Sequence, residues 1–350
     1  MDKIPVAILG ATGTVGQRFV QLLADHPWFE IKSLAASDRS IGKRYVEACH
    51  WLLPSPMPTA VCDLLVQPII PGLEGRLAFS ALPSEVAGPA EKAFAQAGYV
   101  VCSNSSVHRL EPDVPLLIPE VNADHTALIE TQRRQHHWPG FIVTSANCTT
   151  TQLAIALKPL HDAFGLRRVF VVSMQAISGA GYPGVPSFDL VDNLIPFING
   201  EEEKVEQESR KLLGTWRRDR IEDAPFVVSA QCNRVPVREG HTECLSLEFE
   251  RRANPQEVVE TLESFRPSAQ IAALPSTPAQ PIVVRWEPNR PQPILDRDTG
   301  NGMSVVVGRV RSCPLFDVRL VLLGHNTIRG AAGGAIHNAE LLIAQGWLRV

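Results

Sequence analysis

The chain has 350 residues, of which 45% are hydrophobic and 20% are charged, and its formal net charge is −4. This length allows two domains with substantial cores. Positive and negative charges are interspersed, which does not predict a nucleic-acid-binding surface. No apolar run predicts a signal peptide or a membrane-spanning helix. The seven cysteines are scattered without CxxC pairs, which predicts reduced thiols in a cytoplasmic protein and neither a disulfide framework nor a zinc site.

A glycine-rich loop follows the first predicted strand. Residues 6–9 are a short apolar run, residues 10–16 read Gly-Ala-Thr-Gly-Thr-Val-Gly, and residues 17–24 have the composition of a helix. Gly10 permits a tight turn, Gly13 lets the backbone approach a pyrophosphate, and Gly16 lets the helix pack closely on the strand. The spacing is GxxGxxG rather than GxGxxG, but its place directly after an N-terminal strand predicts a dinucleotide-binding domain.

The second predicted strand, residues 29–36, ends where such a domain reads the cofactor ribose. An acidic residue there favours the 2′-hydroxyl of NAD, whereas an arginine favours the 2′-phosphate of NADP. Both types occur, because the next four residues are Ser37, Asp38, Arg39 and Ser40. Two hydroxyls and a guanidinium, with Lys43 and Arg44 close behind, form a set of phosphate donors and favour NADP.

The pattern of strand, loop and helix then repeats. Residues 77–83 and 99–103 read as strands, and residues 85–98 between them read as a helix. This alternation predicts a parallel, doubly wound sheet. The polar loop at 104–109 should lie at the carboxyl edge of that sheet, where ligands bind, and Arg109 is placed to hold an anion there.

One cysteine, Cys148, stands at the predicted start of a helix. Residues 142–144 before it resemble a strand, and residues 152–158 after it have helical composition. The free N–H groups and partial positive charge of a first helical turn favour a thiolate, which is a nucleophile for acyl carbons. A buried structural cysteine is the alternative, but the polar frame Ser-Ala-Asn-Cys-Thr-Thr makes a poor core.

The second half of the chain contains further candidates. A predicted strand at 169–177 carries Gln175, a glycine loop follows at 179–184, and a charged helix opens at Gly200 and continues through Lys211. That helix is expected to be exposed, with paired charges along it. After a β-like run, His241 is bracketed by Arg and Gly residues, and a histidine can exchange protons with a thiol or an oxyanion.

The last third of the chain predicts further strands and a final segment that returns to the nucleotide-binding site. The proline-rich segment 272–293 should cross the surface with little regular sheet. Residues 304–311 and 316–323 read as antiparallel strands. Small residues at 326–335 permit close backbone approach to a ligand, and an apolar helix follows at 336–345.

Together these motifs, in this order, resemble the aspartate-β-semialdehyde dehydrogenase family, in the branch common in archaea and fungi. The segments that carry the resemblance lie at 10–16, 36–40, 103–109, 145–150, 175–184, 200–204, 234–241 and 326–332. The resemblance implies an α/β chain with an N-terminal Rossmann-like domain (1–147), completed by a C-terminal helix (327–350). It also implies a second domain, residues 148–326. This domain is an α+β catalytic and dimerisation domain with a mixed or antiparallel sheet.

The resemblance also implies an activity. Family members catalyse the reversible NADP-dependent reductive dephosphorylation of β-aspartyl phosphate to aspartate semialdehyde, on the route to lysine, methionine and threonine. The implied ligands are this acyl phosphate, the aldehyde, phosphate and NADP, and the expected assembly is a homodimer or homotetramer.

Residue roles follow by the same resemblance. Cys148 would attack the acyl phosphate to form a thioester, His241 would be the acid/base, and Gln175 would orient the substrate. Substrate contacts are expected from Arg234 to the α-carboxylate, Glu201 to the α-amino group, and Arg109, Lys204 and Asn147 to the phosphate; choosing Glu201 over Glu202 or Glu203 assumes an E-x-x-K alignment. The expected cofactor contacts are Gly10, Thr12, Gly13, Thr14, Val15, Gly16, Ser37, Arg39, Ser40, Ser84, Gly179 and Asn326.

Three alternatives keep part of this chemistry. A malonyl-CoA reductase or an N-acetyl-glutamyl-phosphate reductase would share the cysteine and histidine, and a non-catalytic NADP-binding sensor would share the fold. Glu201 and Lys204 favour a substrate with a free amino group and a phosphate. The complete set of Cys148, Gln175, Arg234 and His241 argues against a sensor.

Overall fold

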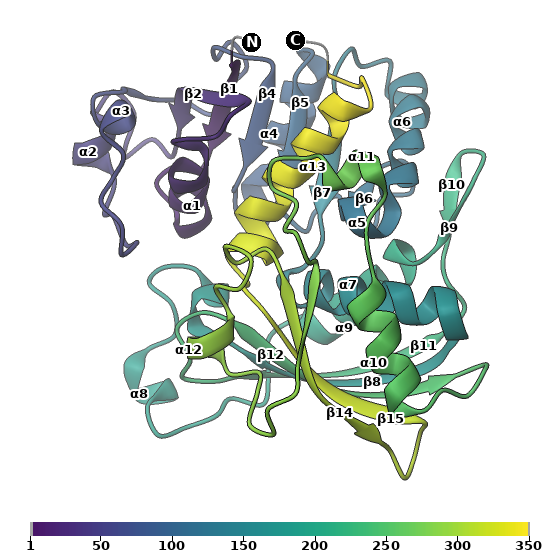
Figure 1. The fold of residues 1–350 in the computed structure, drawn as a ribbon. Coiled ribbons are helices and arrows are strands. Elements are labelled where there is room, and N and C mark those ends of the chain that lie inside the picture. Colours follow the sequence, from purple (N-terminus) through teal and green to yellow (C-terminus); the bar gives the residue numbers. More distant parts are fainter. Residues whose placement is uncertain (1–2, 349–350) are drawn as a thin grey trace.

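The computed structural model describes residues 3–348 as two domains, each built around one sheet (Figure 1). Residues 1–2 and 349–350, at the outer ends of the predicted first domain and its returning helix, lie outside the described residues. The first sheet has the strand order β3-β2-β1-β4-β5-β7-β6, and all its pairs are parallel. Its strands are β1 (Ile4–Leu9), β2 (Phe29–Ala35), β3 (Val66–Gln67), β4 (Leu77–Ser80), β5 (Val100–Ser103), β6 (Leu116–Leu117) and β7 (Phe141–Ser145).

Helices cover both faces of this sheet, which confirms the predicted doubly wound fold. Helix α1 (Thr14–Leu23) and the C-terminal helix α13 (Gly333–Ala344) share one hydrophobic core, and α4 (Ser84–Gln96) packs into another on the opposite face. The predicted return of the chain is therefore observed (Figure 1). The remaining helical segments here are α2 (Tyr45–Ala48), α3 (Thr59–Cys62), α5 (Pro119–Asn122), η1 (Ala123–Ala127) and α6 (Leu128–His136).

The order of strands places the ligand site. The chain moves outward from β1 to β2 and β3, then returns to the other side of β1 with β4 and β5. In open parallel sheets, ligands bind at the carboxyl edge where the strand order reverses. Here that point lies between β1 and β4, directly above the glycine-rich loop that follows β1.

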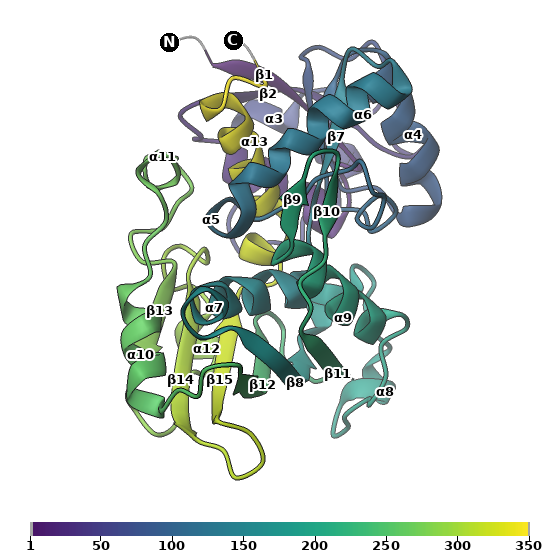
Figure 2. The same cartoon turned by 90° about the vertical axis from the view of Figure 1, so that its right-hand side faces the viewer.

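The second domain is a mixed six-stranded sheet of order β11-β8-β12-β15-β14-β13. Strands β8 and β11, and β13 and β14, pair in parallel, while the other pairs are antiparallel. Three helices lie on one face, α7 (Cys148–Phe164), α9 (Glu201–Leu212) and α10 (Pro255–Ser264) (Figure 2). The strands are β8 (Leu166–Gln175), β11 (Val227–Arg234), β12 (His241–Phe249), β13 (Ile282–Arg285), β14 (Val305–Ser312) and β15 (Val318–Gly324).

The smaller elements of this domain lie around that sheet. They are η2 (Ile177–Ala180), α8 (Ser187–Leu190), the hairpin β9 (Thr215–Arg217) and β10 (Arg220–Glu222), α11 (Ala269–Ala272), α12 (Pro293–Asp296) and η3 (Ile328–Ala332).

Two expectations change here. The proline-rich segment contains one regular strand, β13, which pairs in parallel with β14. Its four residues fall between prolines, so each of them keeps its backbone N–H for the sheet. The charged helix α9 is not simply exposed: Glu201, Val205, Glu208 and Lys211 are buried on one face. A charged residue on a helix can face inward when buried partners satisfy it, and composition alone does not reveal those partners.

The predicted antiparallel pair 304–311 and 316–323 is confirmed as β14 and β15.

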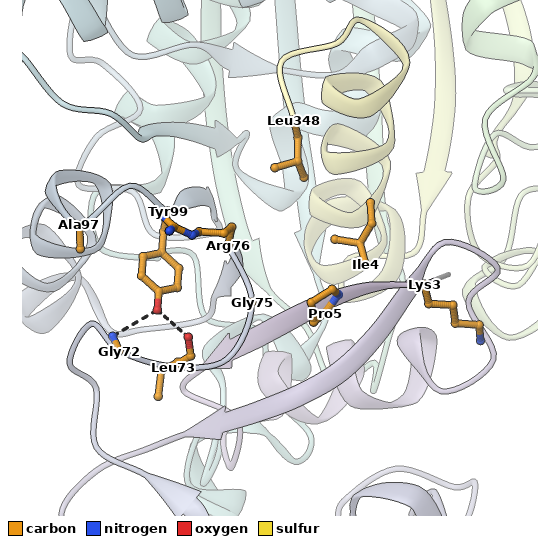
Figure 3. A pocket seen from close by; sticks show the side chains of 10 residues that line it. All are labelled: Lys3, Ile4, Pro5, Gly72, Leu73, Gly75, Arg76, Ala97, Tyr99 and Leu348. Carbon is orange, nitrogen blue, oxygen red and sulfur yellow. Dashed lines mark hydrogen bonds between the residues drawn. The ribbon is translucent and has the colours of Figure 1, made fainter. Parts of the chain in front are cut away.

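A large hollow lies at the edge of the first sheet opposite the glycine loop. Its volume is about 710 Å³, and it opens between the amino ends of β1, β4 and β5 (Figure 3). Tyr99 forms one wall, and its hydroxyl donates to the Leu73 carbonyl at 2.6 Å and accepts from the Gly72 N–H at 3.2 Å. Among the described residues, the lining includes no cysteine, histidine or carboxylate. Size alone therefore does not make it the candidate site.

Two features are absent from the described residues, 3–348. None of the helices there is long and apolar enough to cross a membrane. The same residues include no cluster of three or more histidine, cysteine, aspartate or glutamate side chains arranged to hold a metal ion.

Candidate active site

A cavity of about 490 Å³ lies between the two domains. Its walls come from the carboxyl edge of the first sheet, the start of α7, the ends of β8 and β11, and the first turns of α9. Most of the predicted site residues meet there. The cavity is lined by Val15, Ser84, Arg109, Asn147, Cys148, Gln175, Gly179, Glu201, Lys204, Arg234 and Asn326, among others.

Cys148 and His241 form a close pair at the floor of this cavity. Helix α7 begins at Cys148, as predicted, and the Sγ atom lies 3.2 Å from Nε2 of His241. On the far side of the ring, Nδ1 accepts the backbone N–H of Ala176 at 3.0 Å. Because that amide can only donate, Nδ1 carries no proton, and the neutral ring presents Nε2–H to the sulfur.

The resting charge of the pair differs from the sequence prediction. Burial, reinforced by the Glu201 carboxylate, raises the pKa of Cys148 to about 12, although Arg109 and Arg234 act in the opposite direction. Burial, and then Arg234, lowers the pKa of His241 to about 3. Without substrate the pair is thus a neutral thiol and a neutral imidazole, because the loss of water outweighs the helix-start effect.

Asn147 closes the start of α7 and connects it to α9. Its Oδ1 accepts the N–H groups of Thr149 and Thr150 at 2.9 and 3.1 Å, which is the arrangement of an N-terminal cap. Its Nδ2 donates to Oε1 of Glu201 at 2.8 Å, and the other oxygen of Glu201 is 3.6 Å from Nζ of Lys204. Asn147 was predicted as a phosphate contact; the structure gives it a capping role that the sequence analysis missed.

The structure separates the three consecutive glutamates of α9. Glu201 lines the cavity beside Lys204. Glu202 instead accepts the backbone N–H of Cys232 at 2.9 Å, and Glu203 is exposed. The first of the three is therefore the one that faces the nucleophile.

Gln175 and Arg234 end two neighbouring parallel strands in register with each other. Arg234 is buried, and its Nη1 donates to the carbonyl oxygen of Ala176 at 2.7 Å, which aims the guanidinium across the cavity mouth. Gly179 packs against this group: a Cβ there would lie 2.9 Å from Nη1 of Arg234 and 3.3 Å from Nε2 of His241. A side chain at this position would press on both groups.

The glycine-rich loop has the shape that a dinucleotide requires. Gly10 has φ +81°, and a Cβ on Gly16 would lie 2.2 Å from the Gly10 carbonyl oxygen. Helix α1 begins after Gly13 without a side-chain cap, so its first N–H groups point toward the loop, and the buried Thr14 hydroxyl has no partner within residues 3–348. The other predicted contacts in this loop are Thr12, half-buried, and Val15, which lines the cavity.

The turn after β2 carries hydroxyl and guanidinium groups that can donate hydrogen bonds to a phosphate. Ser37 and Arg39 are exposed, and Ser40 is largely buried in the same turn. Arg44 is engaged elsewhere, because it pairs with Glu47 at 2.6 Å and with a second carboxylate at 3.1 Å. Arg39 is therefore the arginine available to a 2′-phosphate, and the donor set fits a dinucleotide.

Two other predicted cofactor residues organise loops at the cavity rim. Asn326 accepts the N–H of Gly240 at 2.9 Å and donates to the hydroxyl of Ser178 at 2.8 Å. Its amide thus holds the loop before His241 against η2. The hydroxyl of Ser84 lies 3.1 Å from that of Ser106, and both residues line the cavity.

The close approach of Gly330 to Cys148 was predicted only in part. The small residues after Asn326 were predicted to approach a ligand, but Gly330 approaches the nucleophile: a Cβ on it would lie 2.7 Å from Cβ and 2.8 Å from Cα of Cys148. Gly330 belongs to η3, a one-turn π-helix that precedes α13. The composition signalled a close approach without identifying its partner.

Fold and site together define a two-domain dinucleotide-binding protein with a cysteine–histidine centre. Two family models match the chain: residues 5–129 match "Semialdehyde dehydrogenase, NAD binding domain", and residues 157–329 match "Semialdehyde dehydrogenase, dimerisation domain". The chain belongs to the aspartate-semialdehyde dehydrogenase family.

Individual relatives cover nearly the whole chain. An aspartate-semialdehyde dehydrogenase of Archaeoglobus fulgidus is 52% identical over 98% of this chain and 99% of its own, and that of Saccharomyces cerevisiae is 44% identical over 97% of each. The crystal structure of the Candida albicans enzyme with NADP superposes with a TM-score of 0.92 at 42% identity, covering 99% of this chain and 100% of that one. These comparisons give no support to the malonyl-CoA, N-acetyl-glutamyl-phosphate or sensor alternatives.

Proposed function

We propose that this chain catalyses the reversible, NADP-dependent reductive dephosphorylation of L-aspartyl-4-phosphate to L-aspartate-4-semialdehyde, in the biosynthesis of lysine, methionine and threonine. One observation carries the proposal. A cysteine paired with a histidine at 3.2 Å faces a cavity in which Arg234 lies on one side and Glu201 with Lys204 on another. Such a cavity offers separate contacts for a carboxylate, an amino group and a phosphate around one acyl carbon.

The first chemical step is acyl transfer to Cys148. Its sulfur attacks the acyl carbon, the bond from that carbon to the phosphate oxygen breaks, and phosphate leaves with the thiol proton as hydrogen phosphate. Arg109 and Lys204 would bind the phosphate and neutralise its charge. The guanidinium of Arg109, together with that of Arg234, also favours the thiolate and opposes the effect of burial on the Cys148 thiol.

His241 acts in this scheme as a hydrogen-bond donor. With Nδ1 occupied by the Ala176 amide, its Nε2–H stabilises the thiolate and later the oxyanion of the hemithioacetal. When the hemithioacetal oxyanion collapses, the C–S bond breaks, the electron pair returns to sulfur, and the resulting thiolate accepts a hydrogen bond from Nε2–H until a proton from solvent restores the thiol.

The first domain would hold the cofactor through the glycine loop, with Ser37, Arg39 and Ser40 at its 2′-phosphate. NADPH bound there supplies the hydride that reduces the thioester. Gln175 and Arg234 keep the acyl carbon oriented, since the strand ends that carry them are fixed in register.

A direct assay tests this function. The purified protein, given aspartate semialdehyde, NADP and inorganic phosphate, should form NADPH, and the rate should fall to background when phosphate is omitted. Malonate semialdehyde with CoA, and N-acetyl-glutamate semialdehyde with phosphate, serve as matched controls and should give background rates. NADPH formation only with one of those pairs would overturn the assignment of substrate.

We also propose that two copies associate through the uncovered face of the second sheet. The matching family model for residues 157–329 is a dimerisation domain. On that face Phe170 and Val227 are 40% and 61% exposed, and the short helix α8 exposes Phe188 at 97%. Apolar surface of this extent marks an interaction site.

Light scattering measures the mass of the assembly and so distinguishes a homodimer from a homotetramer. Phe170→Lys should shift the wild-type mass toward that of a single chain. An unchanged mass would move the interface elsewhere.

The division of the chain at 147/148, with 327–350 completing the first domain, is likewise a proposal. It is supported by the end of β7 at Ser145 and the start of α7 at Cys148. Free thiols at all seven cysteines support a cytoplasmic location.

A further inference from the structure

The buried face of α9 contains more chemistry than substrate binding requires. Glu201, Lys204, Glu208 and Lys211 are spaced three, four and three residues apart, so they share one face of the helix. The first two line the cavity, but the last two lie deeper. A buried carboxylate and a buried ammonium are costly unless they have specific partners.

Glu208 joins the nucleophile's helix to the arginine of the 104–109 loop. It is 1% exposed, its Oε2 accepts the backbone N–H of Asn147 at 2.6 Å, and its Oε1 accepts Nη1 of Arg109 at 3.0 Å. One carboxylate therefore fixes both the residue that precedes Cys148 and the guanidinium opposite it. These two groups come from segments distant in the sequence.

Lys211, one turn further on, holds the same loop by its main chain. Its Nζ donates to the carbonyl oxygens of Arg109, Glu111 and Val114 at 2.7, 2.8 and 3.0 Å. All three ammonium hydrogens are thereby used. Backbone and side chain of Arg109 are thus both anchored to α9.

Arg109 keeps donors for an anion despite these contacts. Its Nη2 donates to the Asn104 carbonyl at 2.8 Å, so one hydrogen on each terminal nitrogen is committed and one remains. The residue lines the cavity beside Cys148, and its charge favours the thiolate. Any rotation of the guanidinium would change the phosphate contact and the thiol together.

We propose that Glu208 is a positioning residue for the acyl-transfer step, in which phosphate is the leaving group. It holds the guanidinium of Arg109 and the start of α7 at a fixed distance from each other, and Lys211 fixes the loop. The inference rests on the proposed function, because it takes Arg109 as a phosphate ligand. Glu208 does not line the cavity, so it acts only through Arg109 and Asn147.

Glu208→Gln is the informative substitution. The amide keeps the size and one acceptor oxygen, so it can serve Asn147 or Arg109 but not both. In the aldehyde-oxidising direction, the KM for inorganic phosphate should rise about tenfold or more, as expected for loss of a charge-assisted contact that orients a ligand-binding group. The KM for the aldehyde should change much less. Glu203→Gln, an exposed carboxamide on the same helix and outside the cavity, is the matched control and should leave both values unchanged.

A double-mutant comparison separates positioning from general support. In an Arg109→Ala background, Glu208→Gln should add little to the rise in KM for phosphate, because its target is gone. Additive effects of the two substitutions, or equal rises in both KM values, would overturn the inference. If Glu208→Gln does not fold, Glu208→Asp, which keeps the charge and both acceptors but is shorter by one methylene, should show the same preferential effect on phosphate.

A binding readout distinguishes this inference from the proposed function. Inorganic phosphate should protect Cys148 from iodoacetamide in the wild type, and Glu208→Gln should need about tenfold more phosphate for the same protection. Wild-type protein without phosphate-dependent turnover would overturn the proposed function. Wild-type turnover with normal phosphate protection in Glu208→Gln would overturn only the positioning role.

Discussion

Replacing Gly330 by alanine tests whether the returning C-terminal segment sets the position of the nucleophile. The added Cβ would lie 2.7 Å from Cβ, 2.8 Å from Cα and 3.0 Å from the carbonyl oxygen of Cys148. Because none of these atoms ends a flexible side chain, the contact must open by about 0.7 Å to reach the 3.4 Å at which ordinary contact begins.

The expected cost has two parts. Overpacking at a site with no free rotamer costs about 1–3 kcal/mol of stability. A shift of about 1 Å in a reacting group costs roughly 100-fold in rate, so a somewhat smaller shift should lower kcat/KM by about 10- to 100-fold. Phosphate-dependent NADPH formation measures the second quantity, and thermal unfolding measures the first.

Gly88→Ala is the matched control. Gly88 lies inside α4, and a Cβ there would meet only Cγ2 of Val107 at 3.4 Å. Alanine in a helix interior should leave activity unchanged and raise stability by up to about 1 kcal/mol. A Gly330→Ala protein with kcat/KM and unfolding temperature equal to wild type would refute the claim that Gly330 sets the position of Cys148.

Four further substitutions follow from the site. Arg39→Ala should weaken the binding of NADPH much more than that of NADH, because the proposed partner of Arg39 is the 2′-phosphate. Equal losses of affinity for the two cofactors in a binding titration would make Arg39 structural. In the aldehyde-oxidising direction, Lys204→Ala should raise the KM for phosphate more than that for the aldehyde, whereas Arg234→Leu should do the opposite, by at least about tenfold, and also lower kcat; parallel rises would refute separate pockets. Burial and then Glu201 raise the pKa of Cys148 to about 12, so below that pH its thiolate fraction grows with pH, and alkylation of the free enzyme should accelerate from about pH 7 to about pH 9 without a plateau. Glu201→Gln should increase the alkylation rate at every pH, and an unchanged rate would remove Glu201 as a cause.

Local patterns predicted the first domain well. A buried parallel strand, a glycine loop and a helix are consecutive in sequence, so the residues that form the loop also identify it. The start of α7 was predicted for the same reason, since a strand-like run precedes Cys148 and a stretch of helical composition follows it. Antiparallel β14 and β15 are also neighbours along the chain.

What the sequence did not predict depends on contacts between distant segments. The buried face of α9 has the composition of a surface helix, and Glu208 and Lys211 are stable inside only because Arg109 and its loop provide their partners. The protonation of Cys148 depends on how much water the assembled cavity excludes, which a helix-start argument does not contain. The tautomer of His241 depends on one amide, that of Ala176, which directly follows a different strand, β8.

Trapping the covalent intermediate tests the central claim most directly. Wild-type protein mixed with β-aspartyl phosphate in the absence of NADPH should release phosphate in a burst stoichiometric with active sites. Mass spectrometry should then find an aspartyl group on the peptide that contains Cys148, and addition of NADPH should remove it as aspartate semialdehyde. Cys148→Ser should bind NADPH normally, yet show no burst and no adduct. A burst retained in that variant, an adduct on another residue, or phosphate release that requires NADPH would contradict a mechanism built on a Cys148 thioester.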